Sequence, residues 1–306
     1  MTKQDSSRPA TFTARVIAAY GRHLVVRDAQ GRDHAARPFG RKLQVVCGDR
    51  VSCELDAHHD EAHVVAVLDR DSCLYRTNLR AAAEPVVANL TLMLVTLAPL
   101  PVPDLFVIDR YLAAAASSGI RALLVLNKCE LAWPAELAQE LAAYAGAGYT
   151  HLAVSAATGV GIDALRAACA GDIAAFVGQS GVGKSSLITR LVPETDIRTG
   201  ELMLHTQEGT HTTTASHLYD LPGGGHLIDS PGVRDFAPAL AHLEPTSLGF
   251  LEVAQRAPQC RFDDCRHLRE PGCAVRAACE TGAISARRYE SYRRLRRLYE
   301  TLGKAR

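Results

Sequence analysis

The sequence predicts a multidomain protein in which a small β-barrel is followed by an α/β domain and then by a mostly helical domain. Three observations support this prediction. Five short apolar stretches separated by glycines lie between residues 11 and 70, apolar runs alternate with helical patterns over residues 86–235, and a cysteine-rich loop precedes a helical stretch at the C-terminus. The 306 residues suffice for two or three domains, and the 47% of hydrophobic residues suffice to build their cores.

The composition limits where the protein works and what it binds. A net charge of +1 gives no argument for nucleic-acid binding through the charge of the whole molecule. No apolar run approaches the ~18 residues of a membrane span, and residues 1–5 do not begin a signal peptide, so we expect a cytoplasmic protein with no membrane partner. The nine cysteines are an odd number and three of them fall in one loop, which favours a metal site over disulfides.

The N-terminal region has the pattern of a small barrel. We expect residues 1–10 to be a disordered lead-in and residues 11–70 to form five strands, at 13–19, 24–27, 33–37, 44–55 and 62–68. Five strands in about 60 residues predict a barrel of the oligonucleotide-binding (OB) type, and another small barrel would have a similar pattern. The 11 basic and nine acidic residues between 1 and 70 leave two roles open, an RNA-binding surface and a rigid spacer. Residues 71–85 are expected to be a linker.

The central region alternates strands with helices. Strands are expected at 86–97, 122–126, 150–154 and 173–177, and helices at 104–118, 134–145 and 162–169. This alternation predicts right-handed crossovers and a mostly parallel sheet, which binds nucleotides in the loops at the carboxyl ends of its strands. Residues in these loops are therefore the candidates for ligand binding.

A phosphate-binding loop follows the strand at 173–177. The residues Gly178-Gln179-Ser180-Gly181-Val182-Gly183-Lys184-Ser185 end where a helical pattern begins at Ser186. Backbone N–H groups of such a loop wrap a phosphate chain, and the helix N-terminus adds partial positive charge. We expect residues 178–186 to contact a nucleotide, Lys184 to reach the β- and γ-phosphates as a catalytic group, and the Ser185 hydroxyl to bind Mg²⁺. A chance glycine-rich turn is the alternative, and three further segments argue against it.

Each of the three further segments follows an apolar run. In Asp229-Ser230-Pro231-Gly232, Asp229 would hold the Mg²⁺ shell and the Gly232 N–H would sense a γ-phosphate. Asn127-Lys128-Cys129-Glu130 resembles the guanine-reading Asn-Lys-x-Asp element of GTPases, with Glu130 in place of the aspartate. Ser155-Ala156-Ala157 resembles the accompanying loop, in which a backbone N–H meets the guanine oxygen. Together they predict a GTP site that includes Asn127, Lys128, Glu130, Ser155 and Ala156.

The order of these segments is permuted. Ordinary GTPases have the phosphate loop first and the base-reading elements last, whereas here the elements at 127 and 155 precede the loop at 178. With this order, a barrel before it and a Cys/His cluster after it, the chain resembles the bacterial ribosome small subunit-dependent GTPase family over residues 11–299. The resemblance implies a circularly permuted GTPase domain at 86–235 and a zinc-binding helical domain at 236–306.

The same resemblance implies a function. A member of this family would hydrolyse GTP to GDP and phosphate during late maturation of the small (30S) ribosomal subunit. It would bind rRNA and be stimulated by it, and we expect it to be a monomer. Two alternatives are open at this point. One is an enzyme of another specificity, an ATPase or a tRNA-directed GTPase, and the other is an RNA-binding, nucleotide-dependent switch whose intrinsic hydrolysis is minor.

The first switch of the GTPase is expected at Gly209-Thr210-His211-Thr212-Thr213-Thr214. From the family's Gly-x-His-Thr-Thr-Thr pattern, Thr213 is expected to contact the nucleotide and to complete the Mg²⁺ shell with Ser185 and Asp229. Val233 stands where many GTPases place a glutamine that orients the attacking water, and valine cannot do this. His211 is the nearest candidate for that catalytic role, and the alternative is a histidine that only packs the switch.

A second constellation is Cys260-x4-Cys265-x-His267-x5-Cys273. Three thiolates and one imidazole fill a tetrahedral Zn²⁺ shell, so we expect one structural zinc ion with no open position for catalysis. Cys279 competes with His267 as a ligand, but its six-residue spacing from Cys273 across an expected helix would point it away.

The C-terminal stretch from Ile284 has a helical pattern and is strongly basic. An apolar stripe is expected at Tyr289, Tyr292, Leu295, Leu298 or Tyr299, and Leu302. Residues 287–306 include eight basic and two acidic residues, an excess that favours phosphate contact over a merely solvated surface. The residues expected to face away from the stripe are Arg293, Arg294, Arg296 and Arg297.

Overall fold

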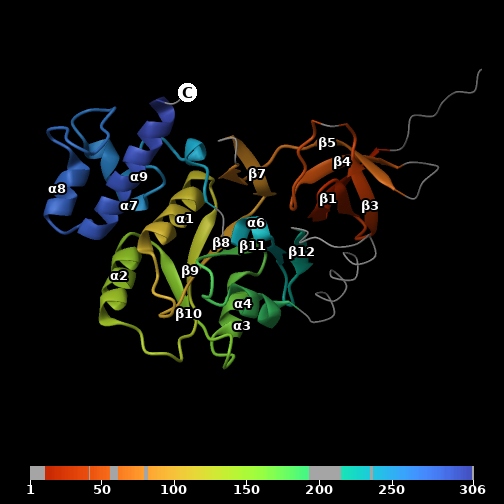
Figure 1. Cartoon of the computed structure of the whole chain (residues 1–306), viewed down its shortest axis with the longest axis horizontal. Coiled ribbons are helices and arrows are strands. Elements are labelled where there is room, and N and C mark those ends of the chain that lie inside the picture. Colours follow the sequence, from red (N-terminus) through yellow and green to blue (C-terminus); the bar gives the residue numbers. More distant parts are fainter. Residues whose placement is uncertain are drawn as a thin grey trace, which may run out of the picture.

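The fold was obtained as a computed structural model, which describes residues 11–40, 42–55, 61–78, 82–192, 215–234 and 237–304. Three parts follow one another across the molecule in the order of the chain: a β-barrel, an α/β domain and a group of helices (Figure 1). The predicted fold class is confirmed in each part. In the part of the chain that is described, no helix combines the length and the apolar character needed to cross a membrane.

The N-terminal part is a closed five-stranded barrel. Each strand pairs with two others in the order β1-β2-β3-β5-β4-β1, and only β3 and β5 run parallel. Val16, Val26, Val51 and Val64 fill its interior with no exposure to water. The strand order and the single parallel pair are those of an OB-type barrel. The strands are β1 (Thr11–Tyr20), β2 (His23–Asp28), β3 (Asp33–Pro38), β4 (Arg50–Leu55) and β5 (Ala62–Val67).

The strand predicted at 44–55 is shorter than expected, since β4 begins only at Arg50. Gly48 has a φ of 91°, in the left-handed region, and a Cβ at this position would lie 2.2 Å from the carbonyl oxygen of Ala88. The chain therefore bends at Gly48, where the barrel backbone meets the next segment at a distance that only glycine permits.

The segment after the barrel also differs from the expectation. Residues 71–85, predicted as a linker, contain β6 (Cys73–Thr77), which forms an antiparallel hairpin with β7 (Ala83–Ala88). The strand predicted at 86–97 is two strands, β7 and β8 (Leu92–Leu97). Asn89 separates them with a φ of 57°, and its Nδ2 donates to the Gly48 carbonyl at 3.0 Å. Asparagine tolerates this left-handed backbone, which a strand cannot contain.

The central sheet is mostly parallel, as predicted. Its order is β10-β9-β8-β11-β13-β12, and only β12 runs antiparallel to its neighbour. The strand that precedes the phosphate loop, β11, therefore lies at the centre. The remaining strands are β9 (Arg121–Leu126), β10 (Thr150–Ala153), β11 (Ile173–Val177), β12 (Ser216–Asp220) and β13 (His226–Asp229).

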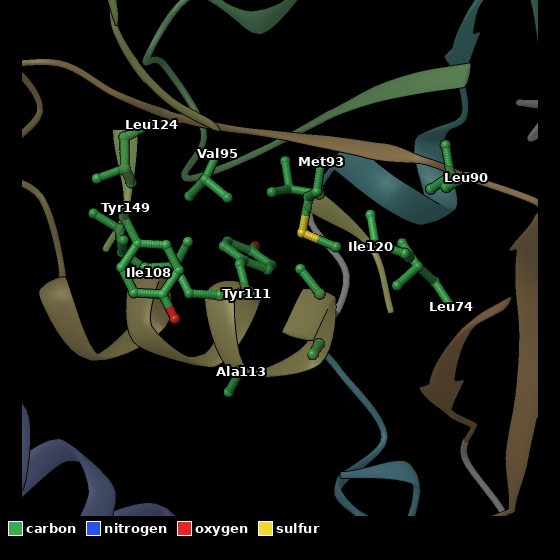
Figure 2. Packing of buried hydrophobic residues seen from close by; sticks show 14 of the residues in the cluster. Leu74, Leu90, Met93, Val95, Ile108, Tyr111, Ala113, Ile120, Leu124 and Tyr149 are labelled. Carbon is green, nitrogen blue, oxygen red and sulfur yellow. The ribbon is translucent and has the colours of Figure 1, made fainter. Parts of the chain in front are cut away.

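Helices cover both faces of this sheet. On one face α1 (Leu105–Ser117) packs Ile108 and Tyr111 towards Met93 and Val95 of β8 (Figure 2), with α2 (Ala135–Gly146) beside it. On the other face α3 (Ile162–Ala168) and α4 (Lys184–Leu191) share a second core with the alternate residues of β8 and β9. Successive residues of β8 thus enter opposite cores, and this explains its continuous apolar sequence.

The barrel and the central sheet are joined through their backbones. Ala18 and Ala19 of β1 pair antiparallel with His217 and Ser216 of β12, so that eleven strands form one continuous sheet. Because β12 directly follows residues 193–214, the segment expected to hold the first switch leads into a strand that is hydrogen-bonded to the barrel.

The C-terminal part is helical. It comprises the 3₁₀ turns η1 (Leu240–His242) and η2 (Ala257–Gln259), α7 (Leu251–Arg256), α8 (Ala274–Glu280) and α9 (Ala286–Lys304), whereas the preceding α6 (Pro231–Arg234) packs against β11 and β7. Tyr292 and Leu295 of the predicted stripe are buried, whereas Leu298 is exposed. The expectation for Arg296 is wrong: it is 5% exposed and donates to the carbonyl oxygens of Pro245 and Thr246. Backbone carbonyls of the loop before α7 therefore satisfy a guanidinium that the helical pattern assigned to solvent.

Candidate functional site

The phosphate loop lies between β11 and α4, at the carboxyl end of the central strand. Its backbone needs glycine at two positions. Gly178 has a φ of 144°, and a Cβ there would lie 2.3 Å from the carbonyl oxygen of Thr96. Gly183 has a φ of 95°, and its Cβ would lie 2.3 Å from Nδ2 of Asn127. The loop is therefore packed against the ends of two neighbouring strands, and side chains at these positions would push it away from them.

Lys184 begins α4 and is 7% exposed. Its Nζ donates to the carbonyl oxygens of Gly178 and Gln179 at 2.6 and 2.8 Å. The ammonium group thus points back across the loop, where the phosphates of a nucleotide would lie against the backbone N–H groups. Contact of Lys184 with the β- and γ-phosphates stays a prediction.

Asn127 connects the segments expected to read the base with the phosphate loop. The side chain is 1% exposed, its Nδ2 donates to the Val182 carbonyl at 2.8 Å, and its Oδ1 accepts from the Ala156 N–H at 3.1 Å. Lys128 adds two contacts, because its Nζ donates to the carbonyl oxygens of Leu100 and Gly181 at 2.7 and 2.9 Å. Three segments that are far apart in sequence therefore meet around one amide and one ammonium group.

Glu130 lies at the exposed edge of this arrangement. A hydrogen bond from the Ser155 side chain lowers the pKa of the Glu130 carboxyl group. The group is therefore ionised at neutral pH and has two acceptor oxygens beside the loop at 155–157, as reading of guanine N1–H and the 2-amino group requires.

Arg190, near the end of α4, is a contact that the sequence did not indicate. Its Nε donates to the Ala156 carbonyl at 2.8 Å and its Nη2 to the Ala157 carbonyl at 3.1 Å. The helix that begins at the phosphate loop thus also holds the loop expected to meet the guanine oxygen. A lone arginine six residues after Lys184 carries no motif, so only the fold reveals this role.

A second unpredicted arginine contacts both expected magnesium ligands, Ser185 and Asp229. Arg234, in α6, donates from Nε to Oδ1 of Asp229 at 2.7 Å and from Nη1 to Oγ of Ser185 at 3.1 Å. Val233, the residue in place of the water-orienting glutamine, is 1% exposed and packed in the core. Its side chain therefore has no access to an attacking water. The residues expected in the first switch, among them His211 and Thr213, lie outside the described residues.

The four predicted zinc ligands come together between α7 and α8. The ligand atoms of Cys260, Cys265, His267 and Cys273 all lie within 4.8 Å of one another, and Cys279 is not part of this group. Nδ1 of His267 lies 3.5 Å from the sulfurs of both Cys260 and Cys273, which are 4.0 Å apart. Burial lowers the pKa of His267, and this favours the neutral imidazole that a metal ion needs. The group could therefore hold a metal ion.

Comparisons with known proteins agree with this site. The model of the family described as RsgA GTPase matches residues 67–238. The protein called small ribosomal subunit biogenesis GTPase RsgA of Pseudomonas aeruginosa is 41% identical over 286 residues, which cover 92% of this chain and 84% of that protein. The protein of the same name from Azotobacter vinelandii is 45% identical over 254 residues, covering 82% of this chain and 74% of that protein.

Two solved structures have the same fold. The crystal structure of YjeQ from Thermotoga maritima superposes with a TM-score of 0.72 at 28% identity and covers 96% of this chain and 99% of that one. The structure of YloQ, a circularly permuted GTPase, superposes with a TM-score of 0.71 at 19% identity and covers 98% of both chains. The permuted order of the nucleotide-binding elements, the fold and the sequence relatives lead to one conclusion: the chain belongs to the RsgA GTPase family.

Proposed function

We propose that this GTPase acts in the biogenesis of the small ribosomal subunit, in its late maturation. The observation that carries the proposal is the meeting of the Asn127, Ser155 and phosphate-loop segments around the Asn127 side chain. This junction joins base reading to phosphate binding within a chain whose relatives are named for small-subunit biogenesis. The subunit and its rRNA would be the partners, and the protein would act as a monomer in the cytoplasm.

In this function the loop 178–186 would hold the phosphates, with Lys184 compensating charge on the β- and γ-phosphates. Asn127, Lys128, Glu130, Ser155 and Ala156 would read the guanine. Ser185, Asp229 and Thr213 would hold Mg²⁺, which supplies charge neutralisation on the phosphates when bound. The hydroxyl and carboxylate donors suit this ion, because Mg²⁺ prefers oxygen ligands. Since Val233 is buried, another group must orient the attacking water, and His211 is our candidate.

The metal of the Cys/His group would be a structural zinc ion. A tetrahedral zinc site with Zn–S bonds of about 2.3 Å and a Zn–N bond of about 2.0 Å has sulfurs about 3.8 Å apart and nitrogen–sulfur distances of about 3.5 Å. The 4.0 Å between the sulfurs of Cys260 and Cys273 and the 3.5 Å to Nδ1 of His267 fit this geometry. Four protein ligands would leave no position for a substrate.

Contact with rRNA would involve the barrel. Its OB-type fold supports this role, since barrels of this class bind oligonucleotides. Charge adds little, because Arg27, Arg32 and Arg37 are paired with Asp33, Asp28 and Glu61. The barrel would therefore contribute shape and polar contacts more than excess positive charge.

The experiment that tests the function is phosphate release from GTP over many turnovers, with and without purified small ribosomal subunits. We expect slow release from the protein alone and faster release with subunits. The Lys184→Ala variant serves as the control for contaminating hydrolases. Equal stimulation by tRNA, or equal turnover of ATP, would support the alternatives of a tRNA-directed enzyme or an ATPase. Binding of GTP without any multiple turnover would leave only a nucleotide-dependent switch.

A further inference from the structure

Arg234 lies at the end of the short helix α6, five residues after Asp229. Its guanidinium binds the Asp229 carboxylate with two nitrogens, Nε to Oδ1 at 2.7 Å and Nη2 to Oδ2. The third nitrogen, Nη1, donates to the Ser185 hydroxyl at 3.1 Å. One cationic group therefore occupies the oxygens of two residues that are expected to serve Mg²⁺.

The guanidinium and a magnesium ion would compete for these oxygens. Mg²⁺ needs oxygen ligands at about 2.0–2.1 Å in near-octahedral arrangement, bound directly or through its own waters. Because Arg234 already donates to both carboxylate oxygens and to the hydroxyl oxygen, the ion must compete with it for the lone pairs of these oxygens. Two cations held by the same carboxylate would also repel each other in this partly buried setting.

Arg234 is suited to being displaced. Its side chain is 32% exposed, and the Asp229 side chain is 18% exposed, so the guanidinium can leave into water without stranding a buried charge. The turn of α6 does not depend on this side chain, because the N–H groups of Val233 and Arg234 both donate to the Ser230 carbonyl, at 2.9 and 3.0 Å. A purely structural arginine would be expected to lie deeper, as Arg288 does with 1% exposure.

We propose that Arg234 is a positioning residue that substitutes for Mg²⁺ on Asp229 and Ser185, so that binding of the ion with nucleotide displaces it. The proposal rests on the magnesium role that we propose for these two residues. It has two consequences. Arg234 competes with Mg²⁺ and raises the concentration of the ion needed for half-saturation. It also compensates the Asp229 charge near the phosphates, which lets the protein retain GDP when Mg²⁺ is scarce.

The test is equilibrium binding of a fluorescent GDP to the full chain, titrated with Mg²⁺ from EDTA-treated solutions. For Arg234→Ala we expect the half-saturating Mg²⁺ concentration to fall about five- to tenfold, because the competing cation is gone. We expect GDP affinity in EDTA to fall by a similar factor, because the Asp229 charge is then no longer compensated. Arg234→Lys should lie between, since an ammonium group cannot span both residues. Arg256→Ala, which removes an exposed arginine of α7, is the control for net charge and should match the wild type.

The outcomes separate this inference from the proposed function. Wild-type and Arg234→Ala proteins with the same Mg²⁺ dependence would overturn the inference and leave the magnesium role standing. Loss of GDP binding by Arg234→Ala at saturating Mg²⁺ would also overturn it, because the arginine would then be a fixed part of the site. GDP affinity that is independent of Mg²⁺ in both the wild type and Arg234→Ala would overturn the magnesium role itself, and this inference with it.

Discussion

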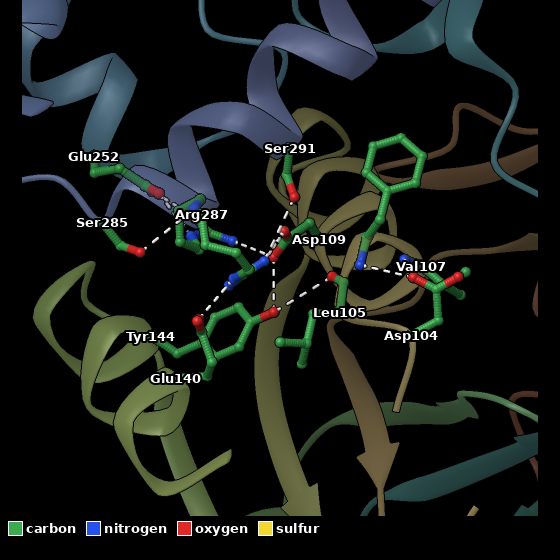
Figure 3. Close-up of polar contacts among 12 residues, drawn as sticks. Asp104, Leu105, Val107, Asp109, Glu140, Tyr144, Glu252, Ser285, Arg287 and Ser291 are labelled. Carbon is green, nitrogen blue, oxygen red and sulfur yellow. Dashed lines mark hydrogen bonds and ion pairs between the residues drawn. The ribbon is translucent and has the colours of Figure 1, made fainter. Parts of the chain in front are cut away.

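Arg288 of α9 and Asp109 of α1 form a buried ion pair across 179 residues of sequence, with 2.7 Å between Nη1 and Oδ1. Arg288 also donates to both carboxylate oxygens of Glu252 at 2.7 Å, and Tyr144 donates its hydroxyl to Asp109 at 2.7 Å. The neighbouring Arg287 forms ion pairs with Asp109 and with Glu140 (Figure 3). Burial lowers the pKa of Arg288, but the two carboxylates outweigh it and raise that pKa, so the guanidinium stays charged.

This cluster predicts a strong effect of a single substitution. Arg288→Met keeps most of the side-chain volume but leaves the buried carboxylate of Glu252 without its partner. We expect the free energy of unfolding to fall by about 3–5 kcal/mol, as for a buried ion pair that loses one member. Urea unfolding followed by circular dichroism would measure it.

Arg297→Met is the matched control, since Arg297 is exposed on the same helix. It should change the free energy of unfolding by less than about 0.5 kcal/mol. Equal effects of the two variants would mean that the ion-pair cluster does not hold α9 against the GTPase domain.

The same cluster shows why the basic helix could be predicted but its role could not. The residues of α9 are helical, and Tyr292 and Leu295 face the core, as the spacing of apolar residues indicates. Its excess of arginine favoured phosphate contact, which stays a prediction for the arginines that α9 exposes. Arg287 and Arg288 instead meet acidic partners on α1, α2 and α7, and no local pattern reveals partners so far away in the chain. Charge counts describe a segment, whereas packing decides where each charge lies.

More of the expected nucleotide site than of α9 could be predicted from the sequence. The strand–loop–helix setting of the phosphate loop and the grouping of the four Cys/His residues could be predicted because each motif carries its geometry in its spacing, whereas the ligands that they bind stay predictions. The contacts of Arg190 and Arg234 could not, since each depends on loops brought together by strand order in the sheet. The pairing of β1 with β12 could not be predicted either, because barrel strands and sheet strands have similar composition.

Metal content should depend on the residues of the Cys/His group and not on the neighbouring thiol of Cys279. In Cys265→Ser the metal content of purified protein should drop from about one zinc per chain towards zero, and the C-terminal helices should lose stability. In Cys279→Ser the metal content should stay unchanged, since this thiol lies outside the ligand group. Metal analysis by mass spectrometry would measure both. A folded wild-type protein free of metal would contradict the zinc assignment.

Glu130 should preserve selectivity for guanine. The carboxylate keeps two acceptor oxygens for guanine N1–H and the 2-amino group, whereas adenine offers no donor at the matching ring nitrogen. We expect unlabelled GTP, and not ATP, to compete with fluorescent GDP, and Glu130→Ala to weaken GDP binding by about tenfold or more. Glu130→Asp should tighten binding if the extra methylene forces the base to shift. Competition by ATP as effective as that by GTP would refute the assignment.

The last prediction concerns coupling between the nucleotide and the subunit. Both expected switches, near Thr213 and Asp229, come late in the permuted domain. In sequence the first of them precedes β12, and Asp229 at the end of β13 pairs with His217 of β12, which also pairs with β1 of the barrel. A γ-phosphate that orders the switches would therefore act on a strand bonded to the proposed RNA-binding part, and through α6 on the zinc-binding part. We expect a non-hydrolysable GTP analogue to bind the protein to small subunits at least about fivefold more tightly than GDP does, and the subunit to strengthen analogue binding by the same factor.

Thr213→Ala should reduce the difference, because it removes the hydroxyl expected to sense the γ-phosphate, and Thr301→Ala on the exposed side of α9 should not. Sedimentation with purified subunits measures these affinities. Equal affinities with GDP and the analogue would end the coupling hypothesis and would leave membership of the GTPase family untouched.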